Sequence, residues 1–531
     1  MSSGHQKPLH KGNHAATWSR HRTKVFRRKD AHPDTIDHPG AGSGDAANDQ
    51  EKVPNGGGSP NELPMYNDQG HRINHAGHRV TPGIQPDGES GRSWFHPWHF
   101  VRICWASSCT ASKWTNVLWP FTIAALVLYF NYPQHSLWVF ICGYIGMVPS
   151  ANLVGFAGQE LARKLPKVAG VMLETTFGSI VEVILFTVLL VQGGDSAEAN
   201  PDPGLGNANS SVIRAAILGS ILANMLLCLG LCFFVGGIFH PQQTFHEAIS
   251  EVGSNLMLVA GLALVIPTIY YNSLYDRLPQ MMLNSETLKI SRATAIILLI
   301  AFVAYVFFQA RSHHGLYEDI LEADEQRDHD RHKDLAKPKL TLTESILALM
   351  IALMFVSFMA VILVKEIEFL VNDRHVSDAF VGLILVPVVE KAAEHITAVD
   401  EAYDNQMNFA LSHVLGASIQ TALLNTPLVI LIGWGLGDKY ALSLNFELFD
   451  AIVLILAIIV VGNFLRDEKS DYLEGALCVF VYVLIAVTAY YYPDPHTTNG
   501  VSSAEGVNST SLAGESTSST EEAVHRLMKM F

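Results

Sequence analysis

The chain has 531 residues, of which 49% are hydrophobic and only 16% are charged, whereas soluble domains carry about 25% charged residues. Its apolar residues gather in nearly charge-free runs of about 20 residues, the length that crosses a bilayer. This distribution excludes a soluble enzyme and a secreted disulfide scaffold, and the net charge of −15 argues against a nucleic-acid partner. We therefore expect an all-α polytopic membrane protein.

Both ends of the chain are polar. Residues 1–92 are rich in Gly, His, Asn and Pro, and such a composition buries too little apolar surface to offset chain entropy. The sequence predicts a disordered cytosolic tail there, and a disordered lumenal tail in the Ser- and Thr-rich residues 494–531. Between the N-terminal tail and the apolar runs, residues 93–135 hold the first span and the aromatic residues Trp94 and Trp98, which are typical of a membrane interface.

Apolar runs predict about eleven membrane-spanning helices, joined mostly by short connections. The expected spans are residues 115–130, 136–157, 169–192, 212–238, 252–271, 293–310, 342–364, 379–399, 407–433, 447–464 and 472–491.

A longer acidic connection, residues 312–341, separates five spans in residues 136–311 from five in residues 342–493. An odd number of spans inverts the second half relative to the first, so we expect two inverted five-helix repeats plus one extra N-terminal helix. The connection itself predicts a short cytosolic helix, either a Ca²⁺-dependent regulatory helix or a plain solvated one. Its carboxylates are Glu318, Asp319, Glu322, Asp324 and Glu325.

The distribution of Lys and Arg predicts the orientation. Basic residues gather in the N-terminal tail, at Arg163 and Lys164, and at Arg466, which fall on one side of the predicted spans. By the positive-inside rule this side is cytosolic, and eleven spans then place the C-terminus in a lumen. Arg277 and Arg292 fall on the opposite side and depart from the rule.

Two spans carry carboxylates at corresponding places in the two halves, and carboxylates inside a bilayer usually mark an ion or proton pathway. When Glu182 in the third span is aligned with Glu394 in the eighth, Gly178 lies opposite Glu390 and Ser179 opposite Lys391. The residues at spacing i, i+4 share one helix face.

Small or helix-breaking residues beside these carboxylates, Gly178, Ser179 and Pro387, predict locally loosened helices that offer backbone carbonyls to a cation. The alternative is a structural ion pair, in which Lys391 neutralises Glu174 or Glu390.

Each of these two spans is followed by one with small polar residues. Ser220 in the fourth span, and Ser418 and Gln420 in the ninth, carry oxygens that suit a hard cation. Taken singly they could equally hold helices together, but their repetition after each Glu-containing span favours cation ligands.

Five motifs in residues 115–493 occur together in one transporter family. They are Leu153-Val154-Gly155-Phe156-Ala157-Gly158-Gln159-Glu160, Thr176-Phe177-Gly178, Gly219-Ser220-Ile221-Leu222, Ala392-Ala393-Glu394-His395 and Ser418-Ile419-Gln420.

With these motifs the chain resembles the cation/proton exchanger family, the vacuolar Ca²⁺/H⁺ antiporter branch of the cation/Ca²⁺ exchanger superfamily, and its fungal members most of all. The resemblance implies an eleven-span antiporter of the vacuolar membrane that moves Ca²⁺ into the vacuole in exchange for H⁺ and serves calcium homeostasis. It also implies that Glu182 and Glu394 are the central metal ligands.

The departures from the family pattern fall on the site. The family usually has Gly-Asn-Ala-x-Glu in both repeats, whereas Ser179 and Lys391 replace the two Asn residues here and Glu390 replaces the second Gly. Glu174 stands where Asn is common, and Gln159 stands where a Glu is common, which leaves Glu160 beside it.

The departing carboxylates and Lys391, together with His395, are our candidates for selectivity or proton coupling. They leave a monovalent cation (Na⁺ or K⁺)/H⁺ antiporter as an alternative, because an ammonium lies within reach of the site. His413 is a further candidate proton partner, although we expect a packing role for it.

Two other classes remain to be weighed. A non-transporting, exchanger-like sensor is an alternative because the site motifs are altered. A metal hydrolase is rejected because Ser250 replaces the second His of a zinc motif that begins at His246. We therefore expect no enzyme and no cofactor, with inorganic cations and the lipid bilayer as partners and homo-oligomerisation left open.

Overall fold

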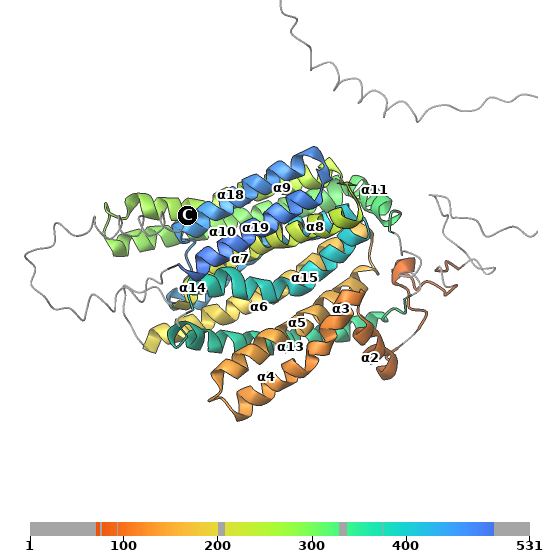
Figure 1. Cartoon of the computed structure of the whole chain (residues 1–531), viewed down its shortest axis with the longest axis horizontal. Coiled ribbons are helices and arrows are strands. Elements are labelled where there is room, and N and C mark those ends of the chain that lie inside the picture. The colour runs from red at the N-terminus through yellow and green to blue at the C-terminus, as the bar shows by residue number, and fades with distance from the viewer. Residues whose placement is uncertain are drawn as a thin grey trace, which may run out of the picture. The chain divides into compact units, whose positions relative to one another are not determined.

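The computed structural model describes residues 71–74, 77–92, 94–199, 208–328, 337–374 and 376–492, and within them the chain is almost entirely helical (Figure 1). The predicted all-α class is thereby confirmed. The C-terminal tail expected from residue 494 lies outside the described residues, as does most of the expected N-terminal tail.

The first half of the chain begins with three shorter helices, α2 (Pro97–Ala106), α3 (Thr110–Thr115) and α4 (Trp119–Asn131). Each of the next five predicted spans coincides with helical structure. These spans are α5 (Ser136–Ala162), α6 (Lys167–Ala199), α7 (Ala208–Leu222) continued by the π-helical turn η3 (Ala223–Cys228) and α8 (Leu229–Phe239), α9 (Glu247–Leu274), and α10 (Gln280–Phe307) continued by the π-helical turn η4 (Phe308–Ser312).

The second half repeats this order of elements after the predicted acidic helix, α11 (His314–Glu325). Its spans are α13 (Leu342–Asn372), α14 (Asp378–Phe380) continued by the π-helical turn η5 (Val381–Leu385) and α15 (Val386–Tyr403), α16 (Met407–Gln420) continued by the π-helical turn η6 (Thr421–Asn425) and α17 (Thr426–Leu436), α18 (Leu448–Phe464), and α19 (Tyr472–Tyr490). Two short strands that the sequence does not predict, β1 (Gln243–Thr244) and β2 (Lys469–Ser470), pair in antiparallel fashion between the two halves.

Nine helices in the described residues are long and apolar enough to cross a membrane, so the predicted number of eleven is not confirmed. One of the two remaining predicted spans is α4, which with 13 residues is shorter than the roughly 20 residues of a bilayer crossing. The other is α15, whose 18 residues include Glu390, Lys391 and Glu394. Although α15 is too highly charged to count as an apolar span, it packs inside the bundle against α5, α8 and α16.

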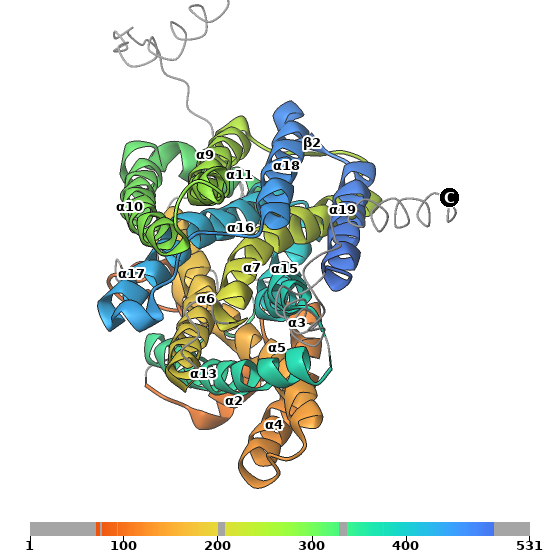
Figure 2. The same ribbon diagram turned by 90° about the vertical axis from the view of Figure 1, so that its left-hand side faces the viewer.

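The helices pack around two apolar cores. The larger core joins residues of both halves, and the smaller one forms where α4, α5 and α13 meet. These three helices lie side by side at one edge of the bundle in both views (Figures 1 and 2). Because α5 and α13 open the two halves, this smaller core also ties the halves together.

The sequence predicts loosened helices at two places, at Gly178 and Ser179 and at Pro387, and the structure differs from this expectation at the first. Helix α6 runs unbroken through Gly178 and Ser179, so the predicted loosening there is wrong. Gly178 serves a different purpose, because a Cβ at this position would lie 2.0 Å from Glu394 Oε1. At Pro387 the expectation is met, since η5 directly precedes it and proline removes a helical hydrogen bond.

The N-terminal segment is ordered further upstream than the sequence predicts. Residues 77–92, expected to be disordered, contain the short 3₁₀ turn η1 (Pro86–Gly88) and lie against the end of α5. Glu89 fixes the segment by accepting hydrogen bonds from Thr81 N (2.8 Å) and Gly91 N (3.0 Å). Burial alone would raise the pKa of Glu89, but these backbone donors outweigh it and the pKa is lowered.

Helix α11 is anchored through one of its carboxylates. Asp324 is fully buried and accepts hydrogen bonds from Asn408 N (2.8 Å), Asn408 Nδ2 (3.0 Å) and Phe409 N (3.2 Å) at the start of α16. Burial raises the pKa of the Asp324 carboxyl, although these hydrogen bonds act in the opposite direction. Asp319 and Glu322 are exposed on the outer side of the helix.

We expect Asp324→Ala to lower the melting temperature of the detergent-purified protein, because buried donors that lose their acceptor cost about 1–3 kcal/mol each. Asp324→Asn should retain most of the stability, since one amide oxygen can accept from both backbone N–H groups while the Asn408 amide turns. Asp319→Ala is the matched control and should melt like the wild type. If Asp324→Ala also melts like the wild type, Asp324 does not anchor α11.

Candidate functional site

The centre of the bundle holds a buried cluster of three charged side chains. Lys391 Nζ on α15 lies 3.4 Å from Glu182 Oε2 on α6 and 3.4 Å from Glu394 Oε2 on its own helix. Lys391 and Glu182 are fully buried, whereas about a quarter of the Glu394 side chain is exposed. The two glutamates that were aligned in the sequence, Glu182 and Glu394, thus place their carboxylates on either side of one ammonium group. The three side chains have a summed charge of −1.

Glu182 is held from the ninth span. Its Oε2 atom accepts hydrogen bonds from Thr421 Oγ1 (2.7 Å) and Asn425 Nδ2 (2.7 Å), the first and last residues of η6. Its Oε1 atom is buried and has no hydrogen-bond partner among the described residues. The sequence analysis did not identify Thr421 and Asn425, although they follow Ser418 at i+3 and i+7, which places all three on one helix face.

Of the other side chains predicted as cation ligands, Ser179, Ser418 and Gln420 form hydrogen bonds to neighbouring groups of the protein. Ser179 Oγ donates to Gln420 Oε1 (2.8 Å), and Gln420 Nε2 donates to Thr175 Oγ1 (2.6 Å), so these three side chains form a chain between α6 and α16. Ser418 Oγ donates to the Val414 carbonyl of its own helix (2.9 Å). Ser220 is fully buried in α7, and no hydrogen-bond partner of its hydroxyl lies within the described residues.

Two further predicted residues of α15 lie beside the charge cluster. Glu390 is 3% exposed, and neither of its oxygens has a hydrogen-bond partner in the described part of the chain. His395 Nε2 lies 3.2 Å from Asn224 Oδ1 in η3, which ties α15 to the fourth span. Together, η3 and η6 therefore place polar side chains from each half, Asn224 from the first and Thr421 and Asn425 from the second, against residues of the helices that carry Glu394 and Glu182.

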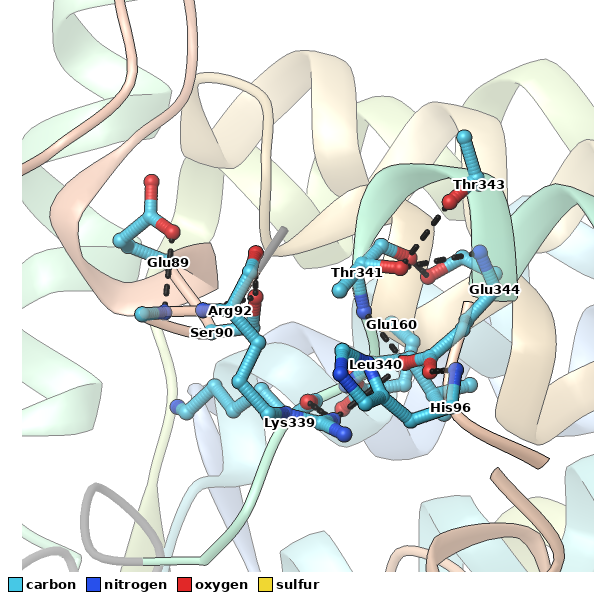
Figure 3. Close-up of polar contacts among 12 residues, drawn as sticks. Glu89, Ser90, Arg92, His96, Glu160, Lys339, Leu340, Thr341, Thr343 and Glu344 are labelled. Carbon is cyan, nitrogen blue, oxygen red and sulfur yellow. Dashed lines mark hydrogen bonds and ion pairs between the residues drawn. The ribbon is translucent and has the colours of Figure 1, made fainter. Parts of the chain in front are cut away.

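Glu160 lies in a different place from the one that the sequence predicts. At the end of α5 it accepts hydrogen bonds from Leu340 N (2.7 Å) and from Arg163 (2.9 Å), as Figure 3 shows for Leu340. It therefore holds the chain that leads into α13 and does not face Glu182 or Glu394. The buried carboxylate is stable in this place because the N–H groups of Leu340 and Arg163 compensate its charge.

The network around Glu160 extends to the N-terminal segment (Figure 3). Glu344, in the first turn of α13, accepts from Thr341 N (3.0 Å) in a capping box and pairs with Arg92 (3.3 Å). Lys164 Nζ donates to the carbonyls of Gly88 and Leu340, both at 2.8 Å. Burial lowers the pKa of Lys164, while the charge of Glu160 acts in the opposite direction.

Glu174 belongs to a second cluster, which the sequence does not predict as a unit. His413 Nδ1 on α16 lies 2.7 Å from Glu401 Oε2 on α15, and His413 Nε2 forms an ion pair with Glu174 Oε2 on α6 at 3.4 Å. Sequence spacing could not reveal this arrangement, because the three residues come from three helices. We expected a packing role for His413, whereas the structure places its ring between the carboxylates of Glu174 and Glu401.

Two cavities adjoin the clusters. A cavity of about 310 Å³, here called the vestibule, is lined by carboxylates that include Asp400, Glu401 and Asp404 of α15 and Glu318 and Glu325 of α11. A smaller cavity of about 50 Å³ lies at the central cluster and is lined by Glu390, Glu394 and His395. The residues common to both linings are Glu174, Thr397 and His413.

The arrangement offers a small cation two carboxylates and the amide and hydroxyl oxygens around them. In the described residues, no group of three or more His, Cys, Asp or Glu side chains has the spacing of a metal site. His246, the start of the rejected zinc motif, caps α9 by accepting a hydrogen bond from Ala248 N (3.0 Å).

Comparisons with known proteins give a consistent result. The family model described as "Sodium/calcium exchanger protein" matches residues 135–311 and 344–491. "Vacuolar cation/proton exchanger 2" of Oryza sativa subsp. japonica is 30% identical over 449 residues, which cover 84% of this chain and 96% of that protein. "Vacuolar calcium ion transporter" of Schizosaccharomyces pombe is 30% identical over 390 residues, covering 73% and 87%.

Two solved structures share the fold. The structure of native YfkE aligns with a TM-score of 0.54 at 22% identity and covers 71% of this chain and all of that chain. The crystal structure of the H⁺/Ca²⁺ exchanger CAX aligns with a TM-score of 0.51 at 14% identity and covers 74% and 92%. At these identities the likeness concerns the fold alone.

Proposed function

This chain belongs to the sodium/calcium exchanger protein family, and from that premise we propose that it is a secondary active antiporter that moves Ca²⁺ into the vacuole in exchange for H⁺. It is a transporter and not an enzyme, as its relatives are cation/proton exchangers and a calcium transporter. The proposal places the protein in the vacuolar membrane as a multi-pass protein, with the N-terminus in the cytosol and the C-terminus in the lumen.

The meeting of Glu182 and Glu394 at one point of the bundle carries the proposal. They come from corresponding spans of the two halves and flank the same Lys391 ammonium within 3.4 Å. Two carboxylates can be neutralised either by one Ca²⁺ or by two protons, so the same pair can bind the two ions in turn. Alternating access between the halves then couples the two movements.

We expect Glu182→Gln and Glu394→Gln each to lower proton-driven ⁴⁵Ca²⁺ uptake at sub-saturating Ca²⁺ at least about tenfold in proteoliposomes with an acidic interior. Loss of one charge-assisted contact, worth about 1.5–3 kcal/mol, lowers the affinity for the cation roughly tenfold or more. Glu251→Gln, an exposed position on α9, is the matched control. Uptake that persists in both variants would contradict the assignment of the site, and absence of any cation flux in the wild type would favour the sensor alternative.

Exchange of a monovalent cation is a second candidate function, and Lys391 is the observation that favours it. Its ammonium stands between the two carboxylates and already supplies one positive charge. If Lys391 remains in place, the two carboxylates need only one more positive charge, which Na⁺ or K⁺ provides. Binding of Ca²⁺ by both carboxylates instead requires Lys391 to move aside.

Replacing Glu390-Lys391 by Gly-Asn should therefore shift selectivity toward Ca²⁺ over Na⁺ and K⁺ by roughly tenfold, because it removes the ammonium group that competes with the cation between Glu182 and Glu394. Glu390 is removed with it, so the net charge near the site stays the same. Flux of the three cations, measured in parallel in proteoliposomes, gives the selectivity ratio. Lys289→Asn, at an exposed lysine of α10, controls for loss of a positive charge elsewhere. An unchanged selectivity ratio would show that Lys391 does not set ion preference.

A further inference from the structure

The boundary between the vestibule and the central cavity is formed by few residues, and two of these residues are ionisable. Only three residues line both cavities in the described structure, and two of them, Glu174 and His413, form an ion pair with each other. A cation that moves between the vestibule and Glu394 through these cavities must pass them. This boundary is therefore a place where passage can be controlled.

His413 joins the two sides of this passage. Its ring is 11% exposed, with Nδ1 2.7 Å from Glu401 of α15 and Nε2 3.4 Å from Glu174 of α6. The same two helices carry Glu394 and Glu182, and His413's own helix leads into η6, which holds Glu182. One imidazole thus connects three of the helices at the central site.

The geometry depends on the protonation state of the ring. A neutral imidazole has one donor nitrogen and one acceptor nitrogen, whereas an imidazolium has two donors. Nδ1 is within hydrogen-bond distance of Glu401, and Nε2, which has no hydrogen-bond partner among the described residues, lies 3.4 Å from Glu174. Only the imidazolium is attracted to both carboxylates. Loss of its proton leaves one nitrogen lone pair directed at a carboxylate, which releases that side of the bridge.

The charges around His413 are mostly negative. The charged and titratable groups that line the two cavities with it are Glu174 of α6, Glu390, Glu394, His395, Asp400, Glu401 and Asp404 of α15, Glu318, Glu325 and Asp328 from α11 and the turn after it, Asp87 of η1, and Arg163 and Lys339 near the ends of α5 and α13. Glu247 and Glu251 of α9, which packs against another side of α16, are absent from both linings.

We propose that His413 is a proton-operated latch between the vestibule and the central cation site. With its proton it holds Glu174 and Glu401 together and closes the passage. When the proton leaves to water in the vestibule, the two carboxylates separate and a cation can pass to Glu182 and Glu394. This inference rests on the proposed function, because it takes the vestibule as the access route of the transported cation, and it makes His413 a positioning residue rather than a ligand.

The latch predicts an effect on access that depends on pH. In ⁴⁵Ca²⁺/Ca²⁺ self-exchange with equal pH on both sides, acid should raise the apparent KM of the wild type more than that of His413→Gln. Free imidazole titrates near pH 6.5, and the two facing carboxylates favour its charged form, so the KM ratio between pH 5.5 and pH 9.0 should be at least about threefold smaller in the variant. His135→Gln, at an exposed position before α5, should behave like the wild type.

A second measurement does not depend on transport. Cys228 lines the central cavity, beyond the latch as seen from the vestibule, and can be kept as the only cysteine. At pH 5.5 a small methanethiosulfonate reagent should label Cys228 several-fold faster in His413→Gln and in Glu401→Gln than in the parent, while at pH 9.0 the rates should converge. The quantity compared is the ratio of the rates at the two pH values, because the charge of Glu401 also acts on the Cys228 thiol and changes its rate at both pH values alike.

The outcomes separate the two proposals. An equal ratio of labelling rates at the two pH values in the parent and both variants, or an unchanged pH dependence of KM, would overturn the latch even with transport intact. If the wild type moves no cation, the proposed function fails while the labelling experiment still decides on the latch. A variant that no longer elutes as a monodisperse protein is replaced by the other, since Glu401→Gln weakens the same bridge from its opposite end.

Discussion

The fold is organised around the need to keep a few charges inside an apolar bundle. A charged side chain in the membrane interior is unfavourable unless it is paired, and Lys391 satisfies this condition for Glu182 and Glu394 at once. Removing Lys391 would leave both carboxylates uncompensated. The positions of α6, α15 and η6 all follow from this cluster, because each contributes a side chain to it or a hydrogen bond.

Small departures from regular helix make the cluster fit. Gly178 leaves room for the Glu394 carboxylate, and the π-helical turn η6 brings Thr421 and Asn425 against Glu182. A π-helical turn stands at the corresponding place of the first half, where Asn224 meets His395. The family's two-fold plan is thus kept in the backbone, even though the side chains at Ser179 and Lys391 have changed.

Charge at the vestibule end of the bundle serves two different purposes. Glu160, Glu344 and Asp324 are saturated with hydrogen bonds and fasten the N-terminal segment, the start of α13 and α11 to the helix ends. The carboxylates of the vestibule instead face a cavity, and those at His413 stand where that cavity meets the central one. Carboxylates thus fasten segments together at the helix ends and line a cavity in the vestibule.

The all-helical membrane class, the order of the spans and the family could be predicted from the sequence, because hydropathy and spacing within one helix are local properties. The sequence also pointed to Glu182 and Glu394, whose role as ligands is part of the proposed function. It could not determine which residues of different helices meet. The donors to Glu182, the bridge of His413 between Glu174 and Glu401, and the place of Glu160 away from the site all depend on contacts between distant segments, which only the packing of the helices decides. The role of Gly178 could not be predicted for the same reason. This glycine makes room for the Glu394 side chain, more than 200 residues away, and does not interrupt its own helix.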